Sequence, residues 1–477
     1  HLIVEAVAYS RATKKDKFLK CMTKYANYIY KVFVEDKSAD FVTGGHEEIE
    51  LALVRLWEET GNKKYLDLAQ FFVDMRGNNG KDFEKDVPYE ERAYDQSHLP
   101  VREQFTAEGH AVRGCYLYSA MADLARIKSD EKLLCACKAI FKNICKKRMY
   151  ITGGIGSSRV KEAFTIDYDL PNQYAYSETC AAISLAMFAK RMLNIENDRI
   201  YSDIIEKVIY NAGISGISLT GNRFFYENPL ALGRKLSDGE ERFMETYGRK
   251  LPIRERVEVF ECSCCPPNIN RFFASIGDYI CSQNDDMLFI HQFINSEVDL
   301  DNGTKLVIET DYPKNGNVKI TYNGSKKISV RLPGWCDNHK TSAKYVLENG
   351  YMNFGNISDI EIDFEMKPVL MRACSKVTDD SGKAAVMYGP VVFCAESVDN
   401  GENLGDMFIE LNGNFEIEDD GFSGFYKITA DGKRLCEQTE LYSKYTADFK
   451  DFKIKLIPYY AFANRGDSEM QVWLNVR

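Results

Sequence analysis

The amino-acid sequence predicts a multidomain protein in which an all-helical domain comes first and β-sandwich domains follow. Three observations predict this fold class. Apolar residues recur at helical spacing up to residue 283, a helix–turn–helix pattern repeats within that region, and the remaining residues alternate between apolar and polar. The expected domains are residues 1–283, 284–375 and 376–477, within the two to four domains that a chain of 477 residues allows at roughly 100–200 residues each.

The helical region contains a repeated hairpin. Helical spacing of apolar residues is clear in 46–60, 63–76, 108–127, 131–146, 174–193 and 199–212. Between helices a short polar turn and a charged helix start recur at intervals of tens of residues, and the aligned apolar positions are Phe18, Tyr65, Leu133 and Tyr201. Such hairpins must stack to bury their apolar faces, which gives a solenoid or a closed toroid. We expect the toroid, because the longer insertions carry unusual residues suited to line one mouth.

The toroid is expected to be of the (α/α)6 type and incomplete at the N-terminus. Fewer helices are predicted than six complete hairpins contain. Residue 1 is His rather than Met, and it opens directly on an apolar helical pattern without a charged leader or a cleavage signal. We therefore expect the native start of the chain to lie upstream of His1.

The region after residue 284 has the pattern of antiparallel strands. Segments such as Met287-Leu-Phe-Ile, Thr304-Lys-Leu-Val-Ile and Val318-Lys-Ile-Thr-Tyr alternate apolar and polar residues, with turn residues such as Asn323-Gly between them. These predict a β-sandwich over 284–375, then a second sandwich or a completion of the first over 376–477. Residues 396–440 are rich in Gly, Asp, Asn and Glu and are expected to form long loops.

Composition excludes several classes of partner. The net charge is −10 and we find no long basic run, whereas a nucleic-acid partner needs a cationic face. No apolar stretch approaches the roughly 18 residues of a membrane span. The 14 cysteines are spread over a long chain rather than arranged as a disulfide framework, which favours a reducing compartment, and we expect a cytoplasmic protein. A homodimer is left open.

The segment Cys262-Ser-Cys-Cys-Pro-Pro carries the sharpest chemical pattern. Three cysteines fall within four residues, just before a predicted helix with Pro266 and Pro267 in its first turn. Adjacent cysteines rarely form a disulfide with each other, because the bond is strained. Soft thiolates crowded at a rigid turn suit zinc, although buried free thiols are the alternative interpretation.

The best candidates for the remaining ligands are Glu178 and Cys180, at the head of the predicted helix 177–193. Residues i and i+2 do not share a face of a regular helix, but at its first turn a carboxylate and a thiolate can converge on one ion. With Cys264 and Cys265 they would complete a tetrahedral zinc site. Taken alone, Glu178 is more often a surface or capping acid.

Two further segments supply candidate polar residues. The glycines of Tyr150-Ile-Thr-Gly-Gly-Ile-Gly are not followed by the Lys-Ser/Thr pair of a phosphate cradle, so a loop lining a pocket is the better interpretation. Downstream, Glu162 stands among aromatic and apolar residues, where a carboxyl pKa would rise and suit a general acid. An ordinary loop acid is the alternative.

Histidines number six, and three of them open predicted helices: His1, His46 and His110. At corresponding helix starts of a toroid they would point into one cavity. Neutral imidazoles there are expected to bind sugar hydroxyls rather than metal, because the thiolates already account for the zinc. A single histidine taken alone would more often be a capped or buried structural residue.

At these residues the sequence resembles the zinc–cysteine β-L-arabinofuranosidases of glycoside hydrolase family 127. The resemblance runs nearly end to end. It is carried by Gly45-His-Glu-Glu-Ile-Glu-Leu, Gly109-His-Ala-Val-Arg, Tyr150-Ile-Thr-Gly-Gly-Ile-Gly, Glu162-Ala-Phe, Asp167-Tyr-Asp-Leu-Pro-Asn, Ser177-Glu-Thr-Cys-Ala, Phe224-Phe-Tyr-Glu-Asn-Pro, Cys264-Cys-Pro-Pro-Asn and Ile457-Pro-Tyr-Tyr-Ala-Phe-Ala-Asn-Arg-Gly.

The resemblance implies an activity and a role for each site residue. It implies a retaining glycosidase that releases β-linked L-arabinofuranose from oligosaccharides or glycoconjugates, with a furanoside as substrate. Cys264 would be the nucleophile, and Glu162 the general acid/base. The zinc ligands would be Glu178, Cys180, Cys264 and Cys265, and the sugar contacts His1, His46, His110, Glu206 and Tyr226.

Two other functions are compatible with the residues alone. A sugar epimerase or lyase on the same toroid would use His and Tyr acid/base pairs without zinc. A non-catalytic carbohydrate-binding protein would use the same four ligands for a structural zinc, because closed four-ligand zinc sites are usually structural.

Overall fold

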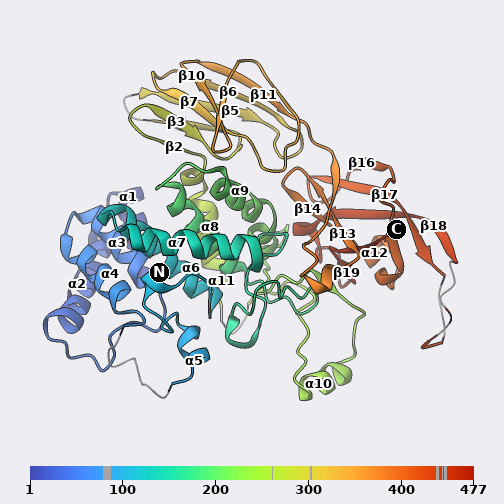
Figure 1. Ribbon diagram of the computed structural model, residues 1–477, viewed down its shortest axis with the longest axis horizontal. Coiled ribbons are helices and arrows are strands. Elements are labelled where there is room, and N and C mark those ends of the chain that lie inside the picture. The colour runs from blue at the N-terminus through green and yellow to red at the C-terminus, as the bar shows by residue number, and fades with distance from the viewer. Residues whose placement is uncertain (79–86, 260–261, 301–302, 437–439, 443, 445–447) are drawn as a thin grey trace. The chain divides into compact units, whose positions relative to one another are not determined.

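The computed structural model describes residues 1–78, 87–259, 262–300, 303–436, 440–442, 444 and 448–477 (Figure 1). The chain forms two compact units. The first unit comprises His1–Met149, Ile155–Asp167 and Ser184–Glu196, and the second comprises Tyr150–Gly154, Tyr168–Ile183 and Asn197–Arg477. None of the helices in the described ranges is both long and apolar enough to span a bilayer.

Helical hairpins build the first unit. They are α1 (Leu2–Thr13) with α2 (Lys17–Tyr30), α3 (Ile49–Thr60) with α4 (Lys63–Met75), and α6 (Ala111–Lys128) with α7 (Glu131–Asn143); the short α5 (Tyr89–Tyr94) precedes α6. The first helices of the hairpins pack side by side, α1 against α3 and α3 against α6 (Figure 1). Later helices are α8 (Thr179–Leu193), α9 (Arg199–Lys207), α10 (Asp238–Thr246) and α11 (Cys265–Ala274).

The turn inside each hairpin explains why the pattern repeats in the sequence. The first helix ends on a residue in the left-handed conformation: Lys14, Gly61 or Ser129. The side chains of Asn62 and Asp130 then cap α4 and α7, and Asp198 caps α9 in the same way. The aligned apolar residues Phe18, Tyr65, Leu133 and Tyr201 each lie in the first turn of the helix that follows. The predicted hairpins are therefore confirmed.

The middle region, after α11, is a sandwich of two five-stranded sheets. One sheet has the order β2-β3-β7-β10-β9 and the other β4-β5-β6-β11-β8. The strands are β2 (Cys281–Gln283), β3 (Met287–Ile290), β4 (Ser296–Asp299), β5 (Lys305–Thr310), β6 (Asn317–Tyr322), β7 (Lys327–Arg331), β8 (His339–Thr341), β9 (Val346–Glu348), β10 (Tyr351–Gly355) and β11 (Asp359–Phe364). Alternate residues of both sheets, such as Ile328 and Ile308, share one buried apolar core, as the strand pattern predicts.

The C-terminal region contributes all but one strand of a ten-stranded sheet. Its strands are β12 (Pro368–Met371), β13 (Lys383–Tyr388), β14 (Val391–Glu396), β15 (Met407–Ile409), β16 (Phe415–Asp419), β17 (Tyr426–Leu435), β18 (Phe449–Pro458), β19 (Met470–Gln471), β20 (Leu474–Val476) and β1 (Ala231–Leu232), which comes from before α10. Pairing runs β14-β18-β17-β15-β20-β13 and returns to β14, so these strands close a circuit.

The expectation of long loops over residues 396–440 is wrong for the part that the structure describes, since 437–439 lie outside it. Strands β15, β16 and β17 and the short helix α12 (Ser397–Asn400) lie in this interval. Apolar residues such as Ile409 and Ile428 point into the closed circuit, whereas the acidic side chain of Glu418 lies on the exposed edge strand β16. The polar composition of an edge hairpin thus conceals its strands.

The two faces of the β13–β14 hairpin bury different cores. Val391 and Phe393 point into the closed circuit, while Val392 and Cys394 face the opposite way. That second face packs against residues from earlier in the chain, Tyr150, Ala175, Phe225, Leu230 and Leu232. The C-terminal sheet therefore supports the segments on both sides of Glu178 and Tyr226.

Candidate active site

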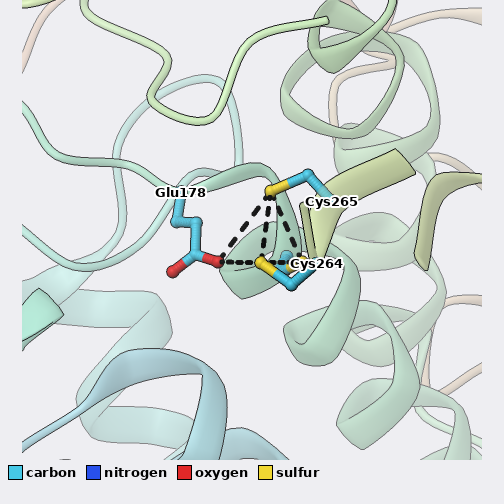
Figure 2. Close-up of side chains that lie close together, drawn as sticks. Glu178, Cys264 and Cys265 are labelled. Carbon is cyan, nitrogen blue, oxygen red and sulfur yellow. Dashed lines mark hydrogen bonds between the residues drawn. The ribbon is translucent and has the colours of Figure 1, made fainter. Parts of the chain in front are cut away.

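Four potential metal ligands meet in the second unit: Glu178, Cys180, Cys264 and Cys265. The carboxylate oxygen and the three sulfurs all lie within 4.8 Å of one another. Figure 2 shows Glu178 reaching toward the sulfurs of Cys264 and Cys265. Within the described residues this is the one group of at least three such side chains that is close enough to hold an ion.

Two helix starts bring these ligands together. Glu178 directly precedes α8, and Cys180 lies in its first turn. Cys264 is the N-cap residue of α11 and Cys265 its first residue, followed by Pro266 and Pro267 as predicted. The positive ends of both helix dipoles therefore face the ligands and favour their anionic forms.

The spacing of the ligand atoms fits a tetrahedral zinc ion. The sulfur of Cys180 lies 3.7 Å from that of Cys264 and 3.5 Å from that of Cys265, and the last two are 3.8 Å apart. Ligands at the zinc–sulfur bond length of about 2.3 Å stand roughly 3.8 Å apart at tetrahedral corners. Glu178 Oε1 completes the set at 3.5 Å from Cys264 and 3.9 Å from Cys265.

The glutamate ligand is oriented by a neighbouring tyrosine. Glu178 is 2% exposed, and its second oxygen, Oε2, accepts a hydrogen bond from the Tyr176 hydroxyl at 3.1 Å. Partners of this kind hold a metal ligand in one rotamer. The sequence motifs quoted above did not single out Tyr176.

The sulfurs are not electrostatically equivalent. Hydrogen bonds from the thiols of Cys180 and Cys265 and from the Tyr226 hydroxyl lower the pKa of Cys264. Hydrogen bonding with Cys264 raises the pKa of Cys180, and hydrogen bonding with Cys180 and Cys264 raises that of Cys265. Even without a metal, the protein therefore concentrates negative charge on Cys264.

A buried asparagine holds the loop that presents Glu178. The side chain of Asn228 donates to the Ser177 carbonyl at 3.0 Å and to Thr179 Oγ1 at 2.9 Å, and accepts from the Ser215 hydroxyl at 2.9 Å. Next to it, the Thr179 backbone N–H donates to the Tyr226 carbonyl. The segment Phe224-Phe-Tyr-Glu-Asn-Pro therefore stabilises the loop that carries Glu178. The sequence did not reveal this role.

The glycine segment 150–156 forms a tight turn beside the same loop. The Gly153 N–H donates to the Tyr150 carbonyl, and the Tyr150 N–H donates to the Gly154 carbonyl. A Cβ on Gly154 would lie 2.0 Å from Ser177 Oγ, so a larger residue there would force the Ser177 side chain to move. Close packing against Ser177 accounts for this glycine.

Glu162 and His110 form a pair in the first unit. His110 Nε2 lies 2.7 Å from Glu162 Oε2. The expected apolar enclosure of Glu162 is not found: its side chain is 37% exposed, and the carboxylate meets an imidazole rather than aromatic carbon. Its apolar neighbours Ala163 and Phe164 are buried while Glu162 itself points outward, because adjacent residues of this tight loop face different ways.

Of the other two histidines, His1 lies at a helix start as expected, whereas His46 lies two residues before Glu48, the N-cap residue of α3. His1 is the N-cap residue of α1, and its Nε2 lies 3.1 Å from Glu48 Oε2. His46 follows Gly45, whose carbonyl accepts a hydrogen bond from Arg113 at 2.7 Å. His46 keeps solvent-exposed surface, yet partial desolvation of the ring, opposed by Glu48, lowers its pKa and favours neutral imidazole.

Glu206 is buried among side chains of the middle region. Glu206 lies on α9 and is 2% exposed. Its two oxygens accept hydrogen bonds from Arg331, Tyr312 and Trp335 of the middle region. The carboxylate therefore forms a buried ion pair within the protein, and a role for Glu206 among the sugar contacts stays a prediction.

Known protein families match three consecutive segments of the chain. Residues 1–278 match the family described as the β-L-arabinofuranosidase, GH127 catalytic domain, residues 287–353 its middle domain, and residues 368–475 the glycoside hydrolase family 127 C-terminal domain. A non-reducing end β-L-arabinofuranosidase from Bifidobacterium longum subsp. longum is 35% identical over 528 aligned residues, covering 99% of this chain and 77% of the relative.

Solved structures agree with the sequence relatives. A GH127 β-L-arabinofuranosidase from Geobacillus stearothermophilus T6 superimposes with a TM-score of 0.92 at 39% identity, covering 100% of this chain and 79% of that one. A second GH127 β-arabinofuranosidase gives a TM-score of 0.87 at 34% identity, covering 100% and 76%. With three consecutive domain matches and a buried group of one glutamate and three cysteines where its motifs predict it, the chain belongs to the β-L-arabinofuranosidases of glycoside hydrolase family 127.

Proposed function

We propose that this glycoside hydrolase releases β-linked L-arabinofuranose from oligosaccharides or glycoconjugates with retention of configuration, using Cys264 as nucleophile and Glu162 as general acid/base. Family membership supports the furanoside substrate class. The difference among the four clustered ligands supports the choice of nucleophile.

The observation that carries this proposal is the unequal burial of the ligands. Glu178 and Cys180 are 2% exposed and Cys265 is 0% exposed, whereas Cys264 is partly exposed. A purely structural site has no reason to leave one sulfur open. A nucleophile must be reachable, and Cys264 is also the sulfur on which the hydrogen bonds concentrate negative charge.

The donor set supports zinc as the resident metal. Three sulfurs and one carboxylate oxygen at tetrahedral spacing are typical of zinc, while harder cations prefer oxygen ligands. When bound, zinc keeps the thiols deprotonated near neutral pH and offsets their charge.

The reaction then follows from the side chains. In the first step the Cys264 thiolate attacks the anomeric carbon. The bond from that carbon to the leaving oxygen breaks, and this oxygen takes both the electron pair and the proton held by Glu162. In the second step a water oxygen attacks the same carbon, Glu162 takes a proton from the water, and the carbon–sulfur bond breaks to restore the thiolate. Two inversions give net retention.

We assign the sugar contacts to His1, His46, His110 and Tyr226. The three histidines lie at the starts of the packed helices α1, α3 and α6 or just before them. Tyr226 places its hydroxyl at the Cys264 sulfur, where the anomeric carbon must arrive.

The decisive experiment combines kinetics and metal analysis. Cys264→Ser should lower turnover of p-nitrophenyl β-L-arabinofuranoside by roughly a thousandfold or more while the fold survives. Glu162→Gln should keep full zinc occupancy and lose turnover chiefly of substrates with poor leaving groups. The matched control is Cys374→Ser, an exposed cysteine of the C-terminal region, which should remain fully active.

Full activity of Cys264→Ser with zinc still bound would show that the zinc is only structural. Product analysis by proton NMR supplies the second criterion, because the first anomer released must be β. Release of the α anomer would exclude a covalent Cys264 intermediate.

A further inference from the structure

The imidazole of His110 is held in a single tautomer. His110 is the N-cap residue of α6, and its Nδ1 accepts a hydrogen bond from the Val112 backbone N–H at 3.3 Å. An acceptor nitrogen carries no proton, so the ring proton resides on Nε2. Nε2 lies 2.7 Å from Glu162 Oε2, so the ring nitrogen that carries the proton contacts the Glu162 carboxylate.

The main chain fixes the two residues against each other. Ala163, next to Glu162, forms an isolated β-bridge with His110, and the Phe164 N–H donates to the Gly109 carbonyl at 2.9 Å. Gly109 has a φ of +71°, and a Cβ there would lie 1.9 Å from the Ala93 carbonyl oxygen, so no other residue fits.

The loop that carries Glu162 is equally constrained. Ser158 and Ala163 exchange two backbone hydrogen bonds of 3.1 and 3.0 Å. Within this loop Glu162 itself has a φ of +53°, a strained value for a residue with a side chain. Strain of this kind persists only where the surroundings impose it, which indicates a required side-chain direction.

Other charged and aromatic groups lie around His110 and Glu162. The ring of Tyr94, from α5, lies 5.9 Å from that of His110. Arg113 of α6 lies over the Tyr94 ring at 5.0 Å, and Lys161 lies 5.8 Å from the same ring while pairing with Glu91 of α5. Positive charges thus flank Tyr94, and His110 Nε2 contacts the Glu162 carboxylate.

We propose that His110 is a positioning residue for the acid/base Glu162, whose Oε2 it holds as an acceptor through both reaction steps. The catalytic proton then passes through Oε1. In the first step Oε1–H gives its proton to the leaving oxygen; in the second step Oε1 takes a proton from water. His110 keeps its own Nε2 proton throughout. This inference rests on the proposed role of Glu162 and goes beyond a sugar-binding role for His110.

The two roles of His110 have different kinetic signatures. A sugar contact helps every furanoside equally, so its loss lowers kcat/KM by one factor for all leaving groups. A group that acts through the acid/base matters most when the leaving oxygen needs a proton. Its loss therefore penalises alkyl furanosides far more than 2,4-dinitrophenyl furanosides.

Two isosteric variants separate the nitrogens of the ring. His110→Asn keeps an acceptor at the Nδ1 position, and Asn is a good N-cap, so α6 stays capped while the donor to Glu162 is lost. His110→Gln places an amide N–H near the Nε2 position and restores that donor. Thermal unfolding of both variants monitors the fold.

We expect His110→Asn to lose roughly tenfold to a hundredfold in kcat/KM on an alkyl β-L-arabinofuranoside and less than about threefold on the dinitrophenyl furanoside. His110→Gln should recover most of that loss. Because the donor favours the carboxylate, the limb of the pH profile that reports Glu162 should move to higher pH in His110→Asn. Equal losses on both substrates, an unmoved pH profile, or no recovery in His110→Gln would each overturn the inference.

The outcome for the unmodified enzyme keeps the two proposals apart. If it hydrolyses neither furanoside, the proposed function fails and the role of His110 fails with it. If it hydrolyses both and His110→Asn loses the same factor on each, the function stands and only the role of His110 is refuted.

Discussion

Glu178 and Glu206 are both buried to 2% exposure, and both belong to the set of residues expected at the site, yet the protein uses them in opposite ways. Glu178 faces three sulfurs and one tyrosine hydroxyl. Glu206 faces the guanidinium of Arg331, which is itself 0% exposed, together with Tyr312 and Trp335.

The difference lies in where the countercharge comes from. A buried carboxylate is costly unless a cation or several donors compensate it. The chain supplies that cation to Glu206 from the middle region, so Glu206 joins α9 to β7 and needs nothing further. Around Glu178 the other three potential ligands are thiols rather than cations, so this group could hold an external cation. Burial alone therefore does not mark a functional carboxylate, whereas the charge of its neighbours does.

Metal removal should produce the largest effect. Exhaustive treatment with a chelator should abolish furanoside hydrolysis and lower Tm, since ligand-bound folded protein is stabilised by mass action. Added zinc should restore both, and the zinc content should return to one ion per chain. Undiminished activity of protein shown to be metal-free would mean that Glu178 is neutralised in another way.

Removing the guanidinium of Arg331, which pairs with Glu206, should have the next largest effect. Arg331→Met leaves Glu206 buried without its cation and should cost about 3–5 kcal/mol in the free energy of unfolding, measured by urea denaturation. The double variant Arg331→Met/Glu206→Gln should regain part of this loss, because the charge of Glu206 is gone and only the less buried Asp203, the other partner of Arg331, keeps an unpaired charge. Zinc content should not change in either protein; a loss of zinc would show that the two clusters are coupled.

Removing the hydroxyl that orients Glu178 should have a smaller effect. Tyr176→Phe should weaken zinc binding by about 10–100-fold, measured by competition with a chromophoric chelator. The control is Tyr174→Phe, which removes a hydroxyl from an exposed side chain two residues away. Equal zinc affinity of the Tyr176 variant and the control would remove Tyr176 from the metal site.

Glu47 illustrates a third solution, neutralisation by a proton. It lies on the loop before α3 and is fully buried, 3.5 Å from Arg76, and neither of its oxygens has a hydrogen-bond partner among the described residues. Burial, opposed by Arg76 and reinforced by Glu50 and Asp95, raises its pKa to about 8.

The raised pKa of Glu47 predicts the direction in which the stability of the protein changes with pH. Between the ordinary carboxyl pKa of 4.5 and about 8, folded Glu47 holds a proton that the unfolded chain has released. Stability must therefore fall as pH rises through that window. Glu47→Gln should lessen the fall between pH 5 and 8, whereas Glu131→Gln, at an exposed position of α7, should leave it unchanged. An identical pH dependence in both variants would refute a protonated Glu47.

Several parts of the site were accessible from the sequence because their signals are local. The adjacent pair Cys264-Cys265 and the prolines after it predict one helix start that carries metal ligands. Glu178-Thr-Cys180 predicts another. Tyr176 and Asn228 escaped notice because their role depends on which loop they touch. The ion pair of Glu206 could not be predicted for the same reason, since its partner Arg331 lies 125 residues further along the chain.

The sequence by itself determined the order of helical and sheet domains, the hairpin repeat and the four side chains that cluster at the candidate metal site, because each follows from spacing over a few residues: periodicity, caps and neighbouring cysteines. Only the tertiary structure decided which buried acids receive a guanidinium, a proton or three thiols, and that Glu162 meets His110. Those outcomes depend on the charge of groups brought close from distant parts of the chain, and electrostatic compensation in a poorly solvated interior is set by distance in space.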